Sequence, residues 1–312
     1  MSGIVGVVFP GQGTQRPGMG ARFCAASRAA QDVFDRANET LGRDLRALCF
    51  QGSPETLRQT ENAQPALFAA NAAAFALLAE FGVTAEFVAG HSVGEFSACY
   101  AGGALSFEQA LLAVEHRAQL MAHVEEEGAM VAVFGLEQPE VEALCEAARG
   151  LGEICVAAHN APNNFVCSGA TRAVERVEAM ARARGALRVN RLATSHAFHS
   201  PLMSAAAPAW RTYLAGMDFE DSGVPVALNT TGELSCDRAS IHRAAADQLD
   251  RPIRWVSCVQ AMLDAGARVF IEAGESKVLS AFIRACSPEA TAISMGADHG
   301  LRRIEALSGV GG

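Results

Sequence analysis

The chain has 312 residues, half of them apolar, and a net charge of −9 from 34 acidic and 25 basic side chains. This length allows one large folded unit, or one unit that carries an insertion. The acidic balance argues against nonspecific nucleic-acid binding, which needs a basic face to neutralise phosphates. No apolar run reaches the roughly twenty residues of a membrane span, so we expect a cytoplasmic protein without nucleic-acid or membrane partners.

Apolar runs alternate with helix-like segments along the chain. Strands are predicted at residues 4–9, 87–89, 131–134, 154–158, 224–228 and 269–271. Helices are predicted at residues 65–81, 106–123 and 174–185, among others. This alternation is typical of an α/β fold with a mainly parallel sheet.

The segment 128–195 has a pattern of its own. It contains, in order, a strand, a helix, two strands, a helix and a strand, at residues 129–134, 139–148, 154–159, 165–168, 171–185 and 186–189. This β-α-β-β-α-β order is that of ferredoxin-like units. We therefore predict a large α/β-hydrolase-like domain, residues 1–127 and 196–312, interrupted by a small ferredoxin-like subdomain, residues 128–195.

The pentapeptide Gly90-His91-Ser92-Val93-Gly94 follows a short apolar run and precedes helix-compatible sequence. In such a GxSxG turn, a strand swings sharply into a helix and exposes the hydroxyl of the central serine. Ligands of open α/β sheets bind at the carboxyl ends of strands, and pockets favour domain interfaces. We therefore expect Ser92 to act as a nucleophile at the mouth of a cleft between the two domains.

A serine hydroxyl needs a base within hydrogen-bond reach, usually a histidine. His196 and His199 lie where the chain re-enters the large domain, and His299 lies near the C-terminus, where ordinary α/β-hydrolases carry the histidine of their triad. Periodicity does not choose between these candidates. The nine cysteines form no CxxC pair and the histidines no HExxH motif, so we expect reduced core thiols and no metal.

Several motifs occur together in this chain. They are Phe9 to Gln15 (FPGQGTQ), Gln64-Pro65-Ala66, Gly90 to Gly94 (GHSVG), Arg117 and residues 195–203 (SHAFHSPLM). In combination they resemble the malonyl-CoA:acyl-carrier-protein transacylases and the acyltransferase domains of polyketide and fatty acid synthases. The resemblance covers residues 4–290. It departs from the family where Gly274-Glu275-Ser276-Lys277 replaces the Gly-Pro-Gly-Lys of many members.

The resemblance implies a role for each matched residue. Ser92 would be the nucleophile, His199 its base, and the backbone N–H groups of Gln12 and Val93 the oxyanion hole. A backbone carbonyl, for which Arg254 is the candidate, would orient His199 in place of an acid. A carbonyl can accept from the second ring nitrogen and fix the tautomer, so no aspartate is needed.

The resemblance also implies the substrate. Arg117 would bind the carboxylate of the acyl group through a bidentate guanidinium contact, while His91, Met121 and Asn160 would line the substrate site. Malonyl-selective members carry HAFH, as this chain does at residues 196–199. Phe198 would then fill the space that an α-methyl group needs, so we expect malonyl-CoA as the substrate.

The implied reaction moves a malonyl group from CoA through a Ser92 ester to the phosphopantetheine thiol of an acyl carrier protein, for polyketide or fatty acid synthesis. We expect a freestanding, trans-acting monomer without a permanently bound cofactor. The carrier protein is expected to dock on the chain's densest basic run, Arg182, Arg184, Arg188 and Arg191. The alternatives are a hydrolase of the same fold, either an editing thioesterase or a general esterase that uses His299, and a non-catalytic docking module.

Overall fold

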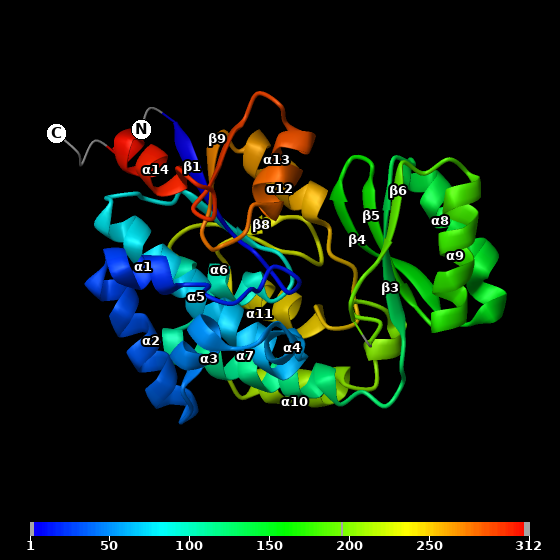
Figure 1. Ribbon diagram of the computed structural model, residues 1–312, viewed down its shortest axis with the longest axis horizontal. Coiled ribbons are helices and arrows are strands. Elements are labelled where there is room, and N and C mark those ends of the chain that lie inside the picture. Colours follow the sequence, from blue (N-terminus) through cyan, green and yellow to red (C-terminus); the bar gives the residue numbers. More distant parts are fainter. Residues whose placement is uncertain (1–2, 195, 309–312) are drawn as a thin grey trace.

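The structure, a computed structural model, describes residues 3–194 and 196–308, and it contains two separate sheets (Figure 1). Sheet A has six strands and is parallel except where β7 meets β8. Its strands, in spatial order, are β10 (Thr291–Ser294), β9 (Ala267–Glu272), β1 (Ile4–Phe9), β2 (Phe87–Gly90), β7 (Val226–Ala227) and β8 (Leu234–Ser235). The central strands are apolar and almost wholly buried, as in parallel sheets with both faces covered.

Helices surround sheet A. They are α1 (Ala21–Ala26), α2 (Arg28–Leu41), α3 (Leu45–Gln51), α4 (Pro54–Arg58), α5 (Thr60–Glu80), α6 (Gly94–Gly102), α7 (Phe107–Ala122), the 3-10 turn η2 (Pro201–Met203), α10 (Ala207–Ala215), α11 (Arg238–Asp247), α12 (Trp255–Asp264), α13 (Val278–Cys286) and α14 (Gly300–Ser308). Helix α5 is alanine-rich and mostly buried, and it packs against α2 and α7. Within the described residues, no helix is long and apolar enough to cross a bilayer.

Sheet B is antiparallel and lies beside sheet A (Figure 1). Its strand order is β4-β5-β3-β6, and α8, η1 and α9 accompany it. The bounds are β3 (Ala129–Phe134), α8 (Gln138–Ala148), η1 (Arg149–Leu151), β4 (Ile154–Ala161), β5 (Asn164–Gly169), α9 (Thr171–Ala183) and β6 (Arg188–Arg191). Sheet B and its helices enclose a hydrophobic core separate from that of the large unit.

The predicted fold class is confirmed: the chain is α/β, with a mainly parallel sheet and a smaller sheet in ferredoxin-like order. All elements of sheet B fall inside the predicted subdomain 128–195, whose division from the large domain stays a prediction. Ser195, the last residue of that range, lies outside the described residues, as do residues 1–2 and 309–312. Strands β8 and β10 were not predicted from the sequence.

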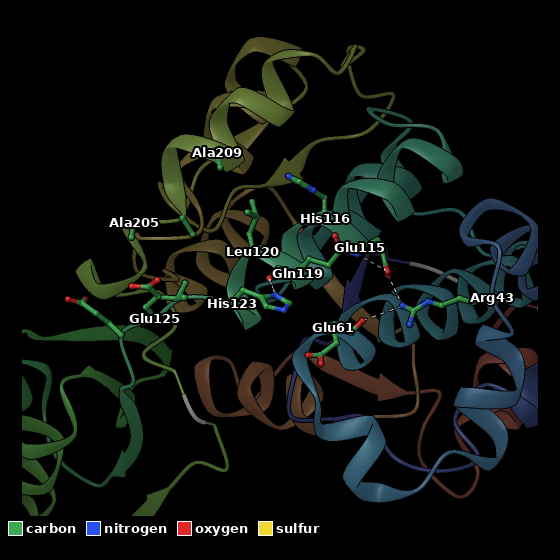
Figure 2. A pocket seen from close by; sticks show the side chains of 13 residues that line it. Arg43, Glu61, Glu115, His116, Gln119, Leu120, His123, Glu125, Ala205 and Ala209 are labelled. Atoms are coloured by element: carbon green, nitrogen blue, oxygen red, sulfur yellow. Dashed lines mark hydrogen bonds and ion pairs between the residues drawn. The ribbon is translucent and has the colours of Figure 1, made fainter.

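Helix α5 begins at Thr60, earlier than the predicted start at residue 65. Pro65 lies inside the helix and has no N–H to donate to the carbonyl of Glu61. That carbonyl accepts instead from Nη2 of Arg43 at 3.3 Å, and the same nitrogen lies 2.6 Å from Glu115 on α7 (Figure 2). An arginine side chain therefore replaces the missing helical hydrogen bond and joins α5 to α7.

The two units share backbone hydrogen bonds. The N–H of Ile253, just before α12, donates to the carbonyl of Ala157 on β4 at 2.9 Å, and the N–H of His159 donates to the carbonyl of Ile253 at 3.0 Å. The two chain segments run parallel at this bridge. The edge of sheet B is therefore fixed to the large unit at the segment just before α12.

Candidate active site

Ser92 lies in a sharp turn between β2 and α6. Its φ of 55° is in the left-handed region, and among the described residues only Ser92 and His199 combine a side chain with positive φ. A Cβ at Gly90 would lie 1.9 Å from the carbonyl of Gly94, and one at Gly94 would lie 2.2 Å from the carbonyl of Phe9. Both glycines are therefore required by the close approach of backbone to backbone, as the nucleophile-elbow prediction implies.

His199 is the histidine that reaches the serine. Its Nε2 lies 2.7 Å from Oγ of Ser92, and its Nδ1 lies 2.9 Å from the carbonyl oxygen of Gln248. Since the carbonyl can only accept, Nδ1 carries the proton and Nε2 is free to accept from the hydroxyl. Burial, reinforced by the Arg117 charge, lowers the pKa of His199 to about 3, so the ring is neutral near pH 7.

The prediction that Arg254 supplies the orienting carbonyl is wrong. The carbonyl of Arg254 accepts instead from the N–H of Cys258 at 3.0 Å, because Arg254 caps the first turn of α12. Gln248, after α11, takes that role. The two rival histidines also lie elsewhere: His196 bonds to the carbonyl of Val124, and His299 is exposed before α14.

Arg117, on α7, is 1% exposed and points at the same serine. Its Nη2 lies 3.3 Å from Oγ of Ser92 and 2.8 Å from Oε1 of Gln248, while its Nη1 donates to Oε1 of Gln64 at 2.6 Å. Burial lowers the pKa of the guanidinium to about 9. Within the described residues no acidic side chain pairs with Arg117, and its Nε has no hydrogen-bond partner.

Val93 and Gln12 flank the nucleophile from two sides. Val93 follows Ser92 at the start of α6, and Gln12 lies in the loop after β1. No hydrogen bond within the described residues uses the backbone N–H of either one. A Cβ at Gly11 would lie 2.2 Å from the carbonyl of His91, so the Gln12 loop presses directly on the elbow. Both N–H groups are thus available for a ligand oxygen.

The other predicted substrate residues are distributed around this centre. Nε2 of His91 donates to Oδ1 of Asn160 at 2.8 Å, so this pair bridges the elbow and β4 of sheet B. Sδ of Met121, one turn beyond Arg117, accepts from Nε2 of Gln64 at 3.4 Å. Phe198 is 6% exposed, and its ring stacks on His196 with centroids 6.0 Å apart.

Four polar residues of this site were missed by sequence reasoning. They are Gln64, Glu95, Asn229 and Gln248, and three of the four are fully buried. Gln64 lay in a recognised motif and Glu95 directly after the elbow, so a search for buried polar residues beside the motifs could have found them. Asn229 follows the predicted strand 224–228, at the carboxyl end where ligands bind. The sequence around Gln248 carries no comparable signal.

The loop of residues 274–277, which departs from the family pattern, forms ion pairs with the segment that follows Gln12. Glu275 pairs with Arg16 at 2.8 Å and with Arg22 at 3.1 Å, and its carboxylate is 5% exposed. Gly274 has a φ of 157°, and a Cβ there would lie 2.8 Å from both Asn71 and Pro10. The departure therefore leaves the elbow and its partners in place.

A separate groove of about 860 Å³ lies on the outward face of α7 (Figure 2). His116, Gln119, Leu120 and His123 line it, whereas Arg117 and Met121 point to the buried face, as positions three and four apart on a helix require. The groove contains none of the residues around Ser92. Helix α7 therefore separates this surface feature from the buried guanidinium.

Comparisons with known proteins agree with this geometry. The profile of the family described as "Acyl transferase domain" matches residues 7–298. The chain belongs to the acyl transferase family. Malonyl CoA-acyl carrier protein transacylase of Bacillus subtilis (strain 168) is 37% identical over 283 residues, which cover 90% of this chain and 89% of the relative.

Two solved structures show how closely the acyl transferase fold is shared. The transacylase of Coxiella burnetii has a TM-score of 0.93 and 33% identity, and the alignment covers 97% of both chains. A malonyl-transacylase solved with its type II polyketide synthase acyl-carrier protein has a TM-score of 0.93 and 32% identity, over 97% of this chain and 99% of that one. The chain is thus an acyltransferase, and the predicted hydrolase alternative is not favoured.

Proposed function

We propose that this acyltransferase moves a malonyl group from malonyl-CoA, through an ester on Ser92, to the phosphopantetheine thiol of an acyl carrier protein. The observation that carries the proposal is that one hydroxyl contacts both an imidazole and a buried guanidinium. Oγ of Ser92 lies 2.7 Å from Nε2 of His199 and 3.3 Å from Nη2 of Arg117. The related transacylases of Bacillus subtilis and Coxiella burnetii support it.

In the first step His199 Nε2 takes the hydroxyl proton while Oγ of Ser92 bonds to the thioester carbon. The carbon–sulfur bond then breaks, and His199 returns the proton to the CoA thiolate. The negative oxygen of the intermediate would accept from the N–H groups of Gln12 and Val93, a type of contact worth about 10²- to 10³-fold in rate. Attack by the pantetheine thiol reverses these steps and frees Ser92.

Arg117 is the residue from which we infer that the acyl group carries a carboxylate. A buried guanidinium without an acidic partner is unfavourable until an anion binds. Its Nε has no partner and its Nη2 is directed toward Ser92. These two nitrogens form one edge of the guanidinium, which matches the two oxygens of a carboxylate. We propose that the malonyl carboxylate occupies this edge.

The choice of malonyl over larger extender units would rest on the packing around the ester. Phe198 is held by its stack on His196 and by the hydrophobic core, and it would exclude an α-methyl branch. One methyl group in such a pocket changes selectivity by only about 1–3 kcal/mol. His91, Asn160 and Met121 are proposed to complete the pocket wall.

We propose that the carrier protein docks at the end of α9 and along β6. The arginines there are exposed; they are Arg182, Arg184, Arg188 and Arg191. Guanidinium nitrogens of Arg182, Arg184 and Arg191 lie 3.5–3.7 Å from glutamate oxygens, which leaves these charges largely available to an acidic partner. Reversing these charges should raise the KM for carrier protein while the acylation rate with malonyl-CoA stays constant. An unchanged KM would remove this docking site.

Three further properties complete the proposal. All nine cysteines are free, which suits a reducing cytoplasm. Few large hydrophobic side chains are exposed among the described residues, and they lie at separate places along the chain, which suits a monomer; they are Ile4, Leu112, Leu151, Leu187 and Val278. The division into domains 1–127 with 196–312 and 128–195 is supported by the core that sheet B and its helices enclose, while the opposite face of sheet B, with Met130, Ala132 and Ala158, packs into the core of the large unit.

Intact-protein mass spectrometry after mixing with malonyl-, methylmalonyl- and acetyl-CoA tests the function. We expect a malonyl adduct that is absent from Ser92→Ala. Arg117→Ala should lower kcat/KM for malonyl-CoA by the equivalent of about 2–5 kcal/mol and leave acetyl-CoA nearly unaffected. An adduct that persists in Ser92→Ala, or equal losses for both thioesters in Arg117→Ala, would contradict the proposal. Arg28→Ala, at an exposed pair on α2, serves as the control.

A further inference from the structure

Gln248 contacts Arg117, His199 and Glu95 and also the backbone of Ser92. Its backbone carbonyl accepts from His199, and its side-chain Oε1 accepts from Nη2 of Arg117 at 2.8 Å. Its Nε2 donates to the carbonyl of Ser92 at 3.1 Å and to Oε2 of Glu95. The side chain is completely buried. One carboxamide therefore lies between the guanidinium and a buried carboxylate.

The direction of this carboxamide is set by its neighbours. Arg117 can only donate, so it requires Oε1, whereas the Ser92 carbonyl and an ionised Glu95 can only accept, so they require Nε2. The second carboxylate oxygen of Glu95 is already engaged, because it accepts from the N–H of Asn229 at 2.8 Å. Glu95 thus has both oxygens committed as acceptors while it is ionised.

We infer that Glu95 is a positioning residue for acyl-group selection: its carboxylate holds the Gln248 carboxamide with Oε1 toward Arg117, and so fixes the guanidinium edge that receives the substrate. This inference rests on the proposed binding of the malonyl carboxylate by Arg117. It assigns a role to the acidic residue that directly follows the GxSxG turn, which the acyl-transfer steps themselves do not use.

Electrostatics supports the same assignment. Burial raises the pKa of the Glu95 carboxyl to about 7, although the Asn229 N–H, the Gln248 amide and the Arg117 charge all favour its ionised form. The other titratable groups coupled to Glu95 are Cys99 on α6 and Cys258 on α12. Burial raises the pKa of both thiols, so they stay neutral near pH 7. Arg117 is therefore the one charged group among them.

A neutral side chain at position 95 disrupts this arrangement. Glutamine there presents one N–H₂ group, so either the Asn229 N–H or the Gln248 N–H₂ must face a donor. Relief by rotation of the Gln248 carboxamide would turn its N–H₂ toward Arg117, which repels it. A protonated Glu95 creates the same conflict, so Glu95→Gln mimics the acidic form of the wild type.

The test is the ratio of kcat/KM for malonyl-CoA to that for acetyl-CoA, measured by single-turnover acylation. Glu95→Gln should lower the malonyl value about 10- to 100-fold, the range for a hydrogen bond to a charged group, and the acetyl value less than about threefold. In an Arg117→Ala background, Glu95→Gln should not change the ratio further. Glu108→Gln, at an exposed pair on α7, is the control.

Equal losses for both thioesters, or no loss, in Glu95→Gln would overturn the inference. If Arg117→Ala lowers kcat/KM mainly for malonyl-CoA but Glu95→Gln lowers it equally for both thioesters, this inference alone fails. If Arg117→Ala itself lowers kcat/KM equally for both thioesters, the proposed function fails first. Should Glu95→Gln not fold, Gln248→Met removes the carboxamide but keeps the backbone carbonyl that accepts from His199. This variant must then lower kcat/KM for malonyl-CoA more than kcat/KM for acetyl-CoA. The wild-type ratio should also fall as pH drops through about 7, and a flat ratio would contradict the role.

Discussion

Asn229 holds the turn of Ser92 in its left-handed conformation: Oδ1 of Asn229 accepts from the Ser92 N–H at 2.8 Å. The Nδ2 group of the same side chain donates to the carbonyl of Gly90 at 2.7 Å. A non-glycine residue with positive φ costs on the order of 1–3 kcal/mol and persists only where its surroundings enforce it. Here one buried amide at the end of β7 secures both sides of the elbow.

Asn229→Ala should therefore destabilise the protein and slow acylation. The substitution leaves the Ser92 N–H and the Gly90 carbonyl without partners in a buried place, at a cost of about 1–3 kcal/mol for each such group. Urea unfolding gives the change in free energy, and malonyl-CoA labelling gives the rate. Asn163→Ala, at an exposed turn position, should change stability by less than about 0.5 kcal/mol. Equal stabilities of the two variants would show that the elbow does not need this amide.

Gly11→Ala should disable the predicted oxyanion hole. The new Cβ would lie 2.2 Å from the carbonyl of His91, so the backbone carrying the Gln12 N–H must move. We expect acylation by malonyl-CoA and by acetyl-CoA to slow together, by about 10²-fold or more. Gly150→Ala, in open space with an ordinary φ, is the matched control. Unaltered rates in Gly11→Ala would rule out Gln12 as a donor.

The pH dependence of acylation should lack the usual histidine step. Since burial lowers the pKa of His199 to about 3, the imidazole is already a neutral base at pH 5. We expect the rate of acetyl-CoA labelling to change by less than about threefold between pH 5 and 8, the same limit as for Glu95→Gln. Acetyl-CoA is the suitable probe because it does not report on Arg117. A fall centred near pH 6.5 would mean that His199 titrates like an exposed histidine.

Glu95 should make the folded protein less stable as pH rises. Its pKa is raised from 4.5 when unfolded to about 7 when folded, so the folded state binds more protons between these values. The contribution is complete below pH 4.5 and is lost as pH rises through 7, by about 3 kcal/mol. The stability of the wild type relative to Glu95→Gln should decrease by that order between pH 4.5 and 8.5 in urea unfolding. A constant difference would indicate an ordinary carboxyl at this position.

Much of the fold and of the site around Ser92 could be predicted because local sequence motifs specify it. The strand of residues 4–9, the elbow around Ser92 and the segment 195–203 each have a local pattern, and the structure brings Ser92, His199 and Arg117 together. Short elements were harder to predict. Strands β8 and β10 have two and four residues, and their existence depends on pairing with β7 and β9 rather than on their own composition.

The orienting carbonyl shows a second limit of sequence reasoning. Every residue has a backbone carbonyl, so only the path of the chain decides that Gln248 faces His199 and that Arg254 starts a helix. The same holds for the start of α5. Pro65 favours the first turn of a helix, and only the distant Arg43 makes its interior position acceptable by occupying the carbonyl of Glu61.

The bridge between Ile253 and β4 limits how the enzyme handles its substrates. Separation of the two halves would break the hydrogen bonds of Ala157 and His159 with Ile253, and would also part Asn160 from His91. Hinge opening is therefore disfavoured, and we expect the site around Ser92 to keep nearly the same width with or without a bound acyl group. We then expect the long pantetheine arms of the proposed donor and acceptor to supply the movement, each entering and leaving a site whose walls stay in place.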